Sequence, residues 1–497
     1  MECVSSTSYS IRINGELHGM FKGKRRLRQG DRLLPYLFVM CMEYLSRLLR
    51  RNTKSGFNFY PRCGVLKISH LIYADDLMML SRGDLKSVET LWGSLLHFGE
   101  ASGLLPNIQK SQIFMAGVEE DIKERITEYT GIPQGMLPIR YLGIPLASEG
   151  LRVVHYAPLI EAITTQIGLW TASSLSYAGR LELIKSVLQG IHCFWLSTMP
   201  VPMGVIDRVV SLRRRFLWDG RKALVVWRDL SLPKEEGGLG VRDAKMWNKP
   251  LLAKVIWNIH GKKDSLWVRW IHHIYLQITS IWEMSTKKDL SALMKRLLTI
   301  RDCVVKQEGT VQGAMGRMDT WKGEKLCQTT YEYFRRKQAR VVWAGIIWAK
   351  YIPPKYSFIV WLAIRGRLLT KDRLEYLQID PTCGLCGIEE ESVHHLFFAC
   401  PFSKSVWEGM REWCGMRSRM TTLLATVKHM KREARGTTWL SRRRRLALSC
   451  TVYYIWITRN RLLFEHLYPN IQDIVYRIKT HVYRVGYSLY PSVSILH

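Results

Sequence analysis

The sequence lacks an apolar run that could cross a membrane and lacks an apolar segment at its start. Its longest apolar stretch, residues 446–457, is too short for a membrane helix of about 20 residues, and residues 1–9 do not read as a secretory signal. Cysteine is scarce, at 11 in 497 residues, which excludes a disulfide scaffold. No internal repeat or low-complexity segment is present. These absences predict an intracellular protein without a membrane anchor, in a reducing compartment.

Acidic residues are also few. The chain has 42 Asp+Glu against 73 Lys+Arg, a formal net charge of +31, which predicts a polyanionic partner. The positive charge gathers in three runs, at residues 22–28, 213–215 and 442–445. A single run is more often a solvated face. Three of them with interleaved aromatic residues predict nucleic-acid contact through phosphates and stacking, without base-specific readout.

Two adjacent carboxylates follow a short apolar run. Residues 65–72 and 77–80 read as two strands joined through Tyr73, Ala74, Asp75 and Asp76, which predicts a hairpin with both acids at its turn. Adjacent carboxylates repel each other, so a divalent cation such as Mg²⁺ would hold them ionised. Such a pair suits two-metal nucleotidyl transfer. The alternative for this dipeptide alone is a solvated acidic turn.

Cysteine and histidine crowd together once, late in the chain. Cys383 and Cys386 are followed by eight residues, His395, four residues and Cys400. Three thiolates and one imidazole make a tetrahedral ligand set for structural Zn²⁺. His394 is the rival imidazole, although the spacing to Cys400 favours His395, and ordinary core cysteines are the alternative to a metal site.

Several short boxes occur together in a characteristic order. Residues 28–38 read RQGDRLLPYLF, residues 73–76 YADD, residues 102–111 SGLLPNIQKS, and residues 141–146 YLGIPL. These boxes resemble those of plant non-LTR (LINE-type) retrotransposon reverse transcriptases, although Arg32 and Leu34 replace the family's proline and serine. Residues 176–188, SYAGRLELIKSVL, and residues 216–220, FLWDG, are similar to later segments of that family. The stretch around Trp361, Gly366 and the cysteine cluster resembles its zinc-binding domain.

The resemblance implies roles for individual residues. Asp75 would be the metal-binding aspartate of the YADD box and Asp76 its companion, while Tyr73 would pack near the primer end. Gln29 and Gly30 would lie against the template and the incoming nucleotide, as the box at residues 28–38 does in that family. Lys110 would act as a cation beside the triphosphate.

One element that the resemblance requires is not found. Family members supply a third aspartate from a strand that precedes the RQGD-like segment by several dozen residues. Only 27 residues precede Arg28, and their carboxylates are Glu2 and Glu16. Fingers, an upstream endonuclease and a downstream RNase H domain are likewise not recognised; residues 453–465 resemble the helix that leads to RNase H. We therefore expect a truncated and inactive polymerase.

The resemblance implies an α+β fold with four segments. Residues 1–150 would form a partial palm and the start of the thumb, and residues 151–345 a helical thumb and connection. Residues 346–420 would be the zinc-binding domain, and residues 421–497 a basic helical tail.

Two functions follow from this sequence. The first is an RNA-directed DNA polymerase that uses an RNA template and a DNA primer or target with Mg²⁺. The second is a non-catalytic, zinc-dependent nucleic-acid-binding protein derived from a retroelement. For either, the expected location is intracellular, and nuclear by the resemblance.

Overall fold

The computed structural model describes residues 8–22, 32–147, 150–171, 175–321, 323, 325–416 and 421–489. The chain divides into two compact units: Met1–Gly150 with Asn258–Met284, and Leu151–Trp257 with Ser285–His497. Over the described ranges it is mostly helical, with small two-stranded sheets, which is compatible with the α+β class. None of the described helices combines the length and the apolar character that a membrane crossing needs.

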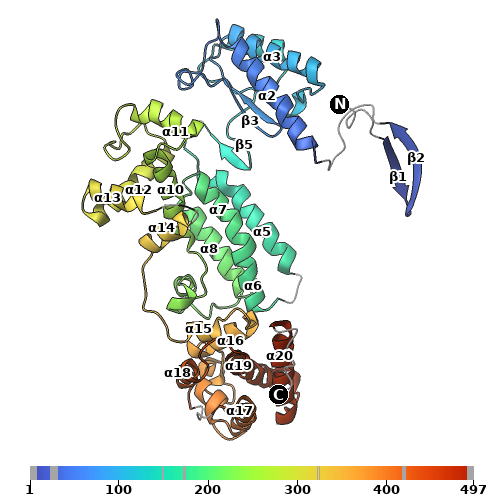
Figure 1. Ribbon diagram of the computed structural model, residues 1–497, viewed down its shortest axis with the longest axis vertical. Coiled ribbons are helices and arrows are strands. Elements are labelled where there is room, and N and C mark those ends of the chain that lie inside the picture. The colour runs from blue at the N-terminus through green and yellow to red at the C-terminus, as the bar shows by residue number, and fades with distance from the viewer. Residues whose placement is uncertain are drawn as a thin grey trace. The chain divides into compact units, whose positions relative to one another are not determined.

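The first unit holds the strands, which pair as antiparallel hairpins (Figure 1). Its main elements are β1 (Ser8–Ile13), β2 (Glu16–Lys22), α2 (Leu34–Asn52), β3 (His70–Tyr73), β4 (Asp76–Met79), α3 (Leu85–Ser102), η1 (Ile108–Lys110), α4 (Glu120–Thr130), β5 (Ile139–Tyr141), β6 (Ile144–Leu146), α11 (Leu266–Ile271) and η5 (His272–Leu276).

Helices α2 and α3 form the core of the first unit. Helix α2 carries a proline in its first turn, where the missing N–H costs nothing. Its buried face contains Leu45 and Leu49, which pack with Trp92 and Phe98 of α3. The apolar residues between Leu37 and Leu48 follow Pro35 at spacings of three and four, which predicts a helix with Met40 and Tyr44 on its apolar face, but both are exposed.

The second unit is helical. Its elements are η2 (Val153–Tyr156), α5 (Ala157–Thr171), α6 (Tyr177–Leu183), η3 (Ile184–Leu188), α7 (Gln189–Thr198), α8 (Met203–Leu217), α9 (Trp227–Leu230), η4 (Lys234–Glu236), α10 (Ala244–His260), α12 (Ala292–Glu308), α13 (Val311–Asp319), α14 (Leu326–Phe334), α15 (Ala344–Ile347), α16 (Pro354–Ile364), η6 (Lys371–Arg373), η7 (Glu375–Leu377), η8 (His395–Ala399), α17 (Pro401–Cys414), α18 (Leu423–Glu433), α19 (Trp439–Glu465) and α20 (Ile471–Leu489). The last residues of α10 belong to the first unit.

The glycine turn at residues 237–240 packs against α16 within the second unit. The indole nitrogen of Trp361 donates to the carbonyl of Gly237 at 2.8 Å, and Trp361 is fully buried. A side chain at Gly238 would place its Cβ 2.0 Å from the carbonyl oxygen of Leu232, so glycine is required there. Arg365 completes the junction with a bond to Asp229 at 2.9 Å.

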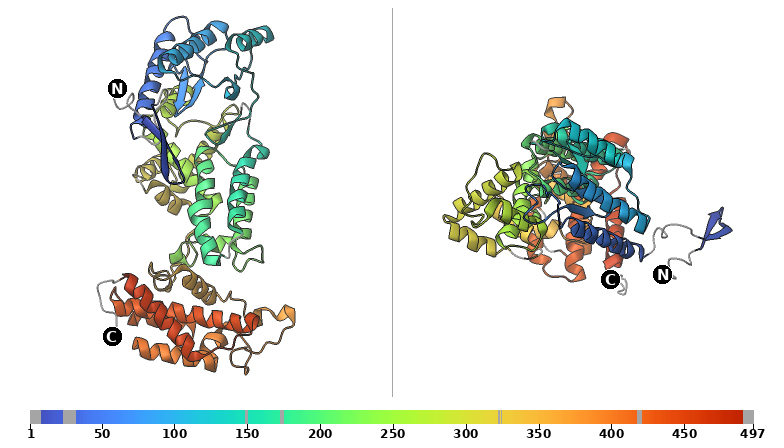
Figure 2. Two further views of the ribbon diagram at one scale, coloured as in Figure 1. Left: turned by 90° about the vertical axis from the view of Figure 1, so that its right-hand side faces the viewer. Right: turned by 90° about the horizontal axis from the view of Figure 1, so that it is seen from above.

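The C-terminal helices pack on one another and on α16. Helix α19 contacts α16, α17 and α20, and Figure 2 shows the orange and red helices lying together. Buried residues run along one face of α20, from Ile474 through Ile478 to Val482. Helices α19 and α20 thus share a core with the segment that contains the cysteine cluster.

A buried histidine in α7 makes the stability of the second unit dependent on pH. Burial and the nearby Arg213 guanidinium lower the pKa of His192 from 6.5 to about 3. The unfolded chain binds an extra proton between those pH values, so the contribution of His192 is complete above pH 6.5 and is lost as pH falls toward 3. We expect the free energy of unfolding to fall by up to about 1.4 kcal/mol per pH unit through this one group.

Urea unfolding at a series of pH values would measure this slope. His192→Gln carries no titrating group at this position and should flatten the profile between pH 6.5 and 4. Acid-induced effects elsewhere in the chain act on both proteins alike. An identical slope in the variant would contradict the assignment.

Candidate metal centre and carboxylate pair

A tight turn presents the first two cysteines of the cluster. Gly387 adopts φ +66°, and its N–H donates to the carbonyl of Cys383 at 2.8 Å. The Cys383 N–H donates to the carbonyl of Glu389 at 2.8 Å, and Thr382 pairs with Glu390 in an antiparallel bridge. These bonds fold the chain back on itself, so that Cys383 and Cys386 face the same space.

A wide helical turn presents the other two side chains. The N–H of His395 donates to Ser392 Oγ at 3.1 Å, which starts the turn. The N–H of Cys400 reaches the carbonyl of His395 at 2.7 Å, and Cys400 then caps α17 by accepting from Lys404 N–H at 2.9 Å. Two helical elements in succession therefore hold His395 and Cys400.

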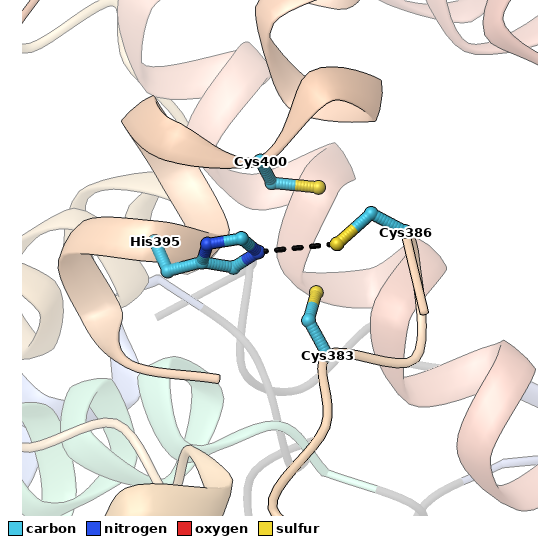
Figure 3. Close-up of side chains that lie close together, drawn as sticks. All are labelled: Cys383, Cys386, His395 and Cys400. Atoms are coloured by element: carbon cyan, nitrogen blue, oxygen red, sulfur yellow. Dashed lines mark hydrogen bonds between the residues drawn. The ribbon is translucent and has the colours of Figure 1, made fainter. Parts of the chain in front are cut away.

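The four side chains converge on one point (Figure 3). Their ligand atoms all lie within 4.8 Å of one another, and Cys386 Sγ is 3.3 Å from His395 Nε2. In a tetrahedral zinc site with bonds of about 2.0–2.3 Å, ligand atoms lie about 3.3–3.8 Å apart. The donor set and its spacing fit Zn²⁺. His394, the rival imidazole, is exposed and does not belong to the cluster.

Hydrogen bonds link the candidate ligands to one another and to a neighbouring carboxylate. A hydrogen bond from the Cys383 thiol lowers the pKa of Cys400, and the same bond raises the pKa of Cys383. On the far side of the imidazole ring, His395 Nδ1 lies 2.8 Å from Glu389 Oε2. That contact turns Nε2 toward the sulfur atoms, as carboxylates do behind metal-bound histidines.

The carboxylate pair lies on a hairpin, as the sequence indicates. Strands β3 and β4 pair with Tyr73 opposite Asp76, and Ala74, at φ +51°, forms the turn with Asp75. Both acids and Tyr73 are exposed. The first strand is shorter than predicted, since residues 65–69 precede β3.

Tyr141 of β5 lies near the carboxylate pair. Burial, with a smaller contribution from the negative charge of Asp76, raises the pKa of Tyr141 on β5, so that strand lies beside the hairpin. Over the described ranges, neither Asp75 nor Asp76 belongs to a group of three or more possible metal ligands. The sequence does not single out Tyr141 as a neighbour of the acids.

The remaining predicted residues are not gathered at the carboxylates. Lys110 ends η1 with an exposed side chain, and its backbone N–H donates to Asn107 Oδ1 at 3.2 Å. No interaction between Lys110 and the two acids is present in the part of the chain that the structure describes. Gln29 and Gly30 lie outside the described residues.

Arginines of the second and third basic runs make internal contacts, whereas Arg214 and Arg215 of the second run are exposed. Arg213 is fully buried, 5.2 Å from the ring centre of Trp227. Arg444 donates to the carbonyls of Cys414 at 3.1 Å and Glu433 at 2.7 Å, the last residues of α17 and α18. Arg445 donates to Ala434 at 3.0 Å. Local charge density cannot distinguish such helix-capping arginines from phosphate-binding ones. Residues 23–28 lie outside the described residues.

Comparison with known protein families identifies two segments. Residues 2–146 match the family described as reverse transcriptase (RNA-dependent DNA polymerase). Residues 326–407 match the family described as zinc-binding in reverse transcriptase.

Three proteins of Arabidopsis thaliana are similar to parts of the chain. One, named "putative ribonuclease H protein", is 30% identical over 186 residues, which is 36% of this chain and 30% of that protein. Two uncharacterized mitochondrial proteins are 45% identical over 71 residues (13% of this chain, 54% of the relative) and 34% identical over 91 residues (18% and 61%). The matches thus span between 30% and 61% of the length of these relatives.

Proposed function

Because this chain carries a reverse transcriptase segment and the zinc-binding domain of such enzymes, we propose that it is a non-LTR retroelement protein that has kept a structural zinc site and nucleic-acid binding but performs little or no nucleotidyl transfer. The observation that carries the proposal is a contrast between two sites. The four side chains proposed as zinc ligands lie together and are mostly buried, whereas the two exposed aspartates have no third possible metal ligand beside them among the described residues.

The four segments expected from the sequence become parts of this proposal. Residues 1–150 act as a partial palm with the start of the thumb, and residues 151–345 as thumb and connection. Residues 346–420 form the zinc domain, followed by the basic helical segment 421–497. The proposed partners are an RNA template and a DNA primer or target, and the proposed location is the nucleus.

The palm residues are proposed to keep the roles that any residual nucleotidyl transfer would use. Asp75 and Asp76 would hold Mg²⁺, which would supply activation of a primer 3′-hydroxyl and neutralisation of the leaving pyrophosphate. Asp75 supplies the principal carboxylate and Asp76 a second one. Tyr73 contacts the primer end, and Lys110 approaches the triphosphate. Gln29 and Gly30 would contact the template and the incoming nucleotide.

The zinc residues are proposed to act structurally. Cys383, Cys386, His395 and Cys400 hold Zn²⁺ with all four tetrahedral positions filled, which leaves no position for a water or a substrate. Metal binding then contributes folding energy to the surrounding helices. This supports the second function, a zinc-dependent nucleic-acid-binding protein, whether or not the palm is active.

Primer extension by the full chain on an RNA template with Mg²⁺ tests the catalytic part. We expect no extension above the level of the Asp75→Asn and Asp76→Asn variants, because a missing metal ligand worth about 4 kcal/mol lowers the rate about a thousandfold. Template binding, measured by fluorescence anisotropy, should be equal in all three proteins. Extension that the two variants abolish would show an active polymerase with a third carboxylate from elsewhere.

A further inference from the structure

Glu391 lies between the two halves of the cysteine and histidine cluster. It follows the turn that carries Cys383 and Cys386 and precedes Ser392, which starts the turn of His395. Its backbone N–H donates to the carbonyl of Pro381 at 2.8 Å, and its carbonyl accepts from Asp372 N–H at 3.1 Å. Glu391 therefore fixes how the two ligand-bearing segments meet.

The Glu391 carboxylate is fully buried and paired with an arginine from a distant helix. Arg459 of α19 donates through Nη2 to Oε1 at 2.6 Å and through Nε to Oε2 at 3.0 Å. The backbone N–H of Lys371 adds a bond to Oε1 at 3.0 Å. A two-pronged arginine contact of this kind fixes direction as well as distance.

Arg459 is itself buried and held in place. Its side chain is 4% exposed, it donates to Asn460 Oδ1 at 3.0 Å, and its guanidinium carbon lies 5.2 Å from the ring centre of Trp456. One turn further along α19, Leu462 approaches the cysteine turn, since a Cβ added at Gly384 would lie 3.7 Å from Leu462 Cδ2. Helix α19 thus touches both the turn and its base.

We propose that α19 is an integral part of the zinc centre and that Arg459 is a positioning residue for its ligands. The inference rests on the zinc site proposed above, and it goes beyond the matched zinc-binding segment, which ends at residue 407. Without Arg459, a buried and unpaired Glu391 carboxylate would be driven toward water. That movement would separate Cys383 and Cys386 from His395 and Cys400. By linkage, zinc binding and the docking of α19 stabilise each other.

Zinc affinity of the full chain, measured by competition with a chromogenic chelator, tests the proposal. Arg459→Met should lower the zinc affinity at least tenfold. Arg459→Lys, which keeps the charge but loses the two-pronged contact, should retain part of the wild-type affinity. Arg461→Gln is the matched control, because it removes an exposed arginine from the same helix, and it should leave the affinity unchanged.

Hydrogen exchange supplies a second readout. Zinc removal should speed amide exchange in α19 near residues 452–462, and this response should shrink in Arg459→Met. If that variant does not fold, the double variant Glu391→Gln, Arg459→Met leaves no buried charge unpaired and replaces it in both measurements. A tenfold loss is expected there as well, because the two-pronged contact that fixes the direction of side chain 391 is absent.

The outcomes separate this inference from the zinc site itself. A wild-type chain that holds no zinc overturns the zinc site and this inference together. A wild-type chain that binds zinc no more tightly than Arg459→Met and the double variant overturns the inference alone and leaves the zinc site standing.

Discussion

Replacing Cys400 by serine is expected to abolish zinc binding and to loosen the C-terminal helices. Cys400 is fully buried, is one of the four candidate ligands and caps the start of α17. Structural zinc contributes about 10–16 kcal/mol to the folding of zinc-finger peptides, so its loss exceeds any single side-chain contact. Zinc content by mass spectrometry should fall from one ion per wild-type chain to about zero in the variant.

Cys303→Ser is the matched control. Cys303 is half-buried in α12 and belongs to no ligand group among the described residues, so the variant should keep its zinc. A chelator should act on wild type as Cys400→Ser does, with faster amide exchange in α16 to α19 and unchanged exchange in α2 and α3. Zinc retained by Cys400→Ser would mean that the ligand assignment is wrong.

Replacing Trp361 by alanine is expected to lower the free energy of unfolding of the second unit by about 3–5 kcal/mol. The indole is fully buried, its ring centre lies 5.6 Å from that of Phe358, and its N–H satisfies the carbonyl of Gly237. Removing the ring leaves a cavity at the junction between the glycine turn and α16. Urea unfolding followed by circular dichroism measures the change.

Two further variants separate packing from hydrogen bonding at this junction. Trp361→Phe keeps most of the apolar volume and loses the bond to Gly237, so it should cost about 1–2 kcal/mol. Trp267→Ala removes an indole of the first unit that is 38% exposed, so it should change the free energy of unfolding of the second unit by less than about 1 kcal/mol. Equal losses in Trp361→Ala and Trp267→Ala would contradict the assignment of Trp361 to the core.

Sequence reasoning worked best where chemistry depends on local spacing. The hairpin of Asp75 and Asp76 was predictable because a two-residue turn between apolar strands is encoded within a few positions. The gathering of Cys383, Cys386, His395 and Cys400 was predictable for the same reason, since each pair is close in sequence and Cys383 and Cys386 share one turn. The apolar face of α2 was only partly correct, because the burial of Leu49 and the exposure of Met40 depend on where α3 packs.

Long-range partners could not be read from the sequence. Nothing local marks Arg459 as the partner of Glu391, 68 residues away, or distinguishes Arg213 and Arg444 from arginines that bind phosphate. A charged side chain is assigned to solvent by default, and only packing can place it inside.

The sequence by itself determined the family boxes, the excess of positive charge, the carboxylate turn and the identity of the possible zinc ligands. Only the tertiary structure decided that His395 rather than His394 lies with the cysteines and that Glu389 contacts the His395 ring. It also decided that α19 packs beside the site through Arg459 and Glu391. The physical reason is the separation along the sequence between the residues that interact. Turns and ligand spacing follow from bonds between near neighbours, whereas the burial of a charge requires a partner that the fold brings from elsewhere in the chain.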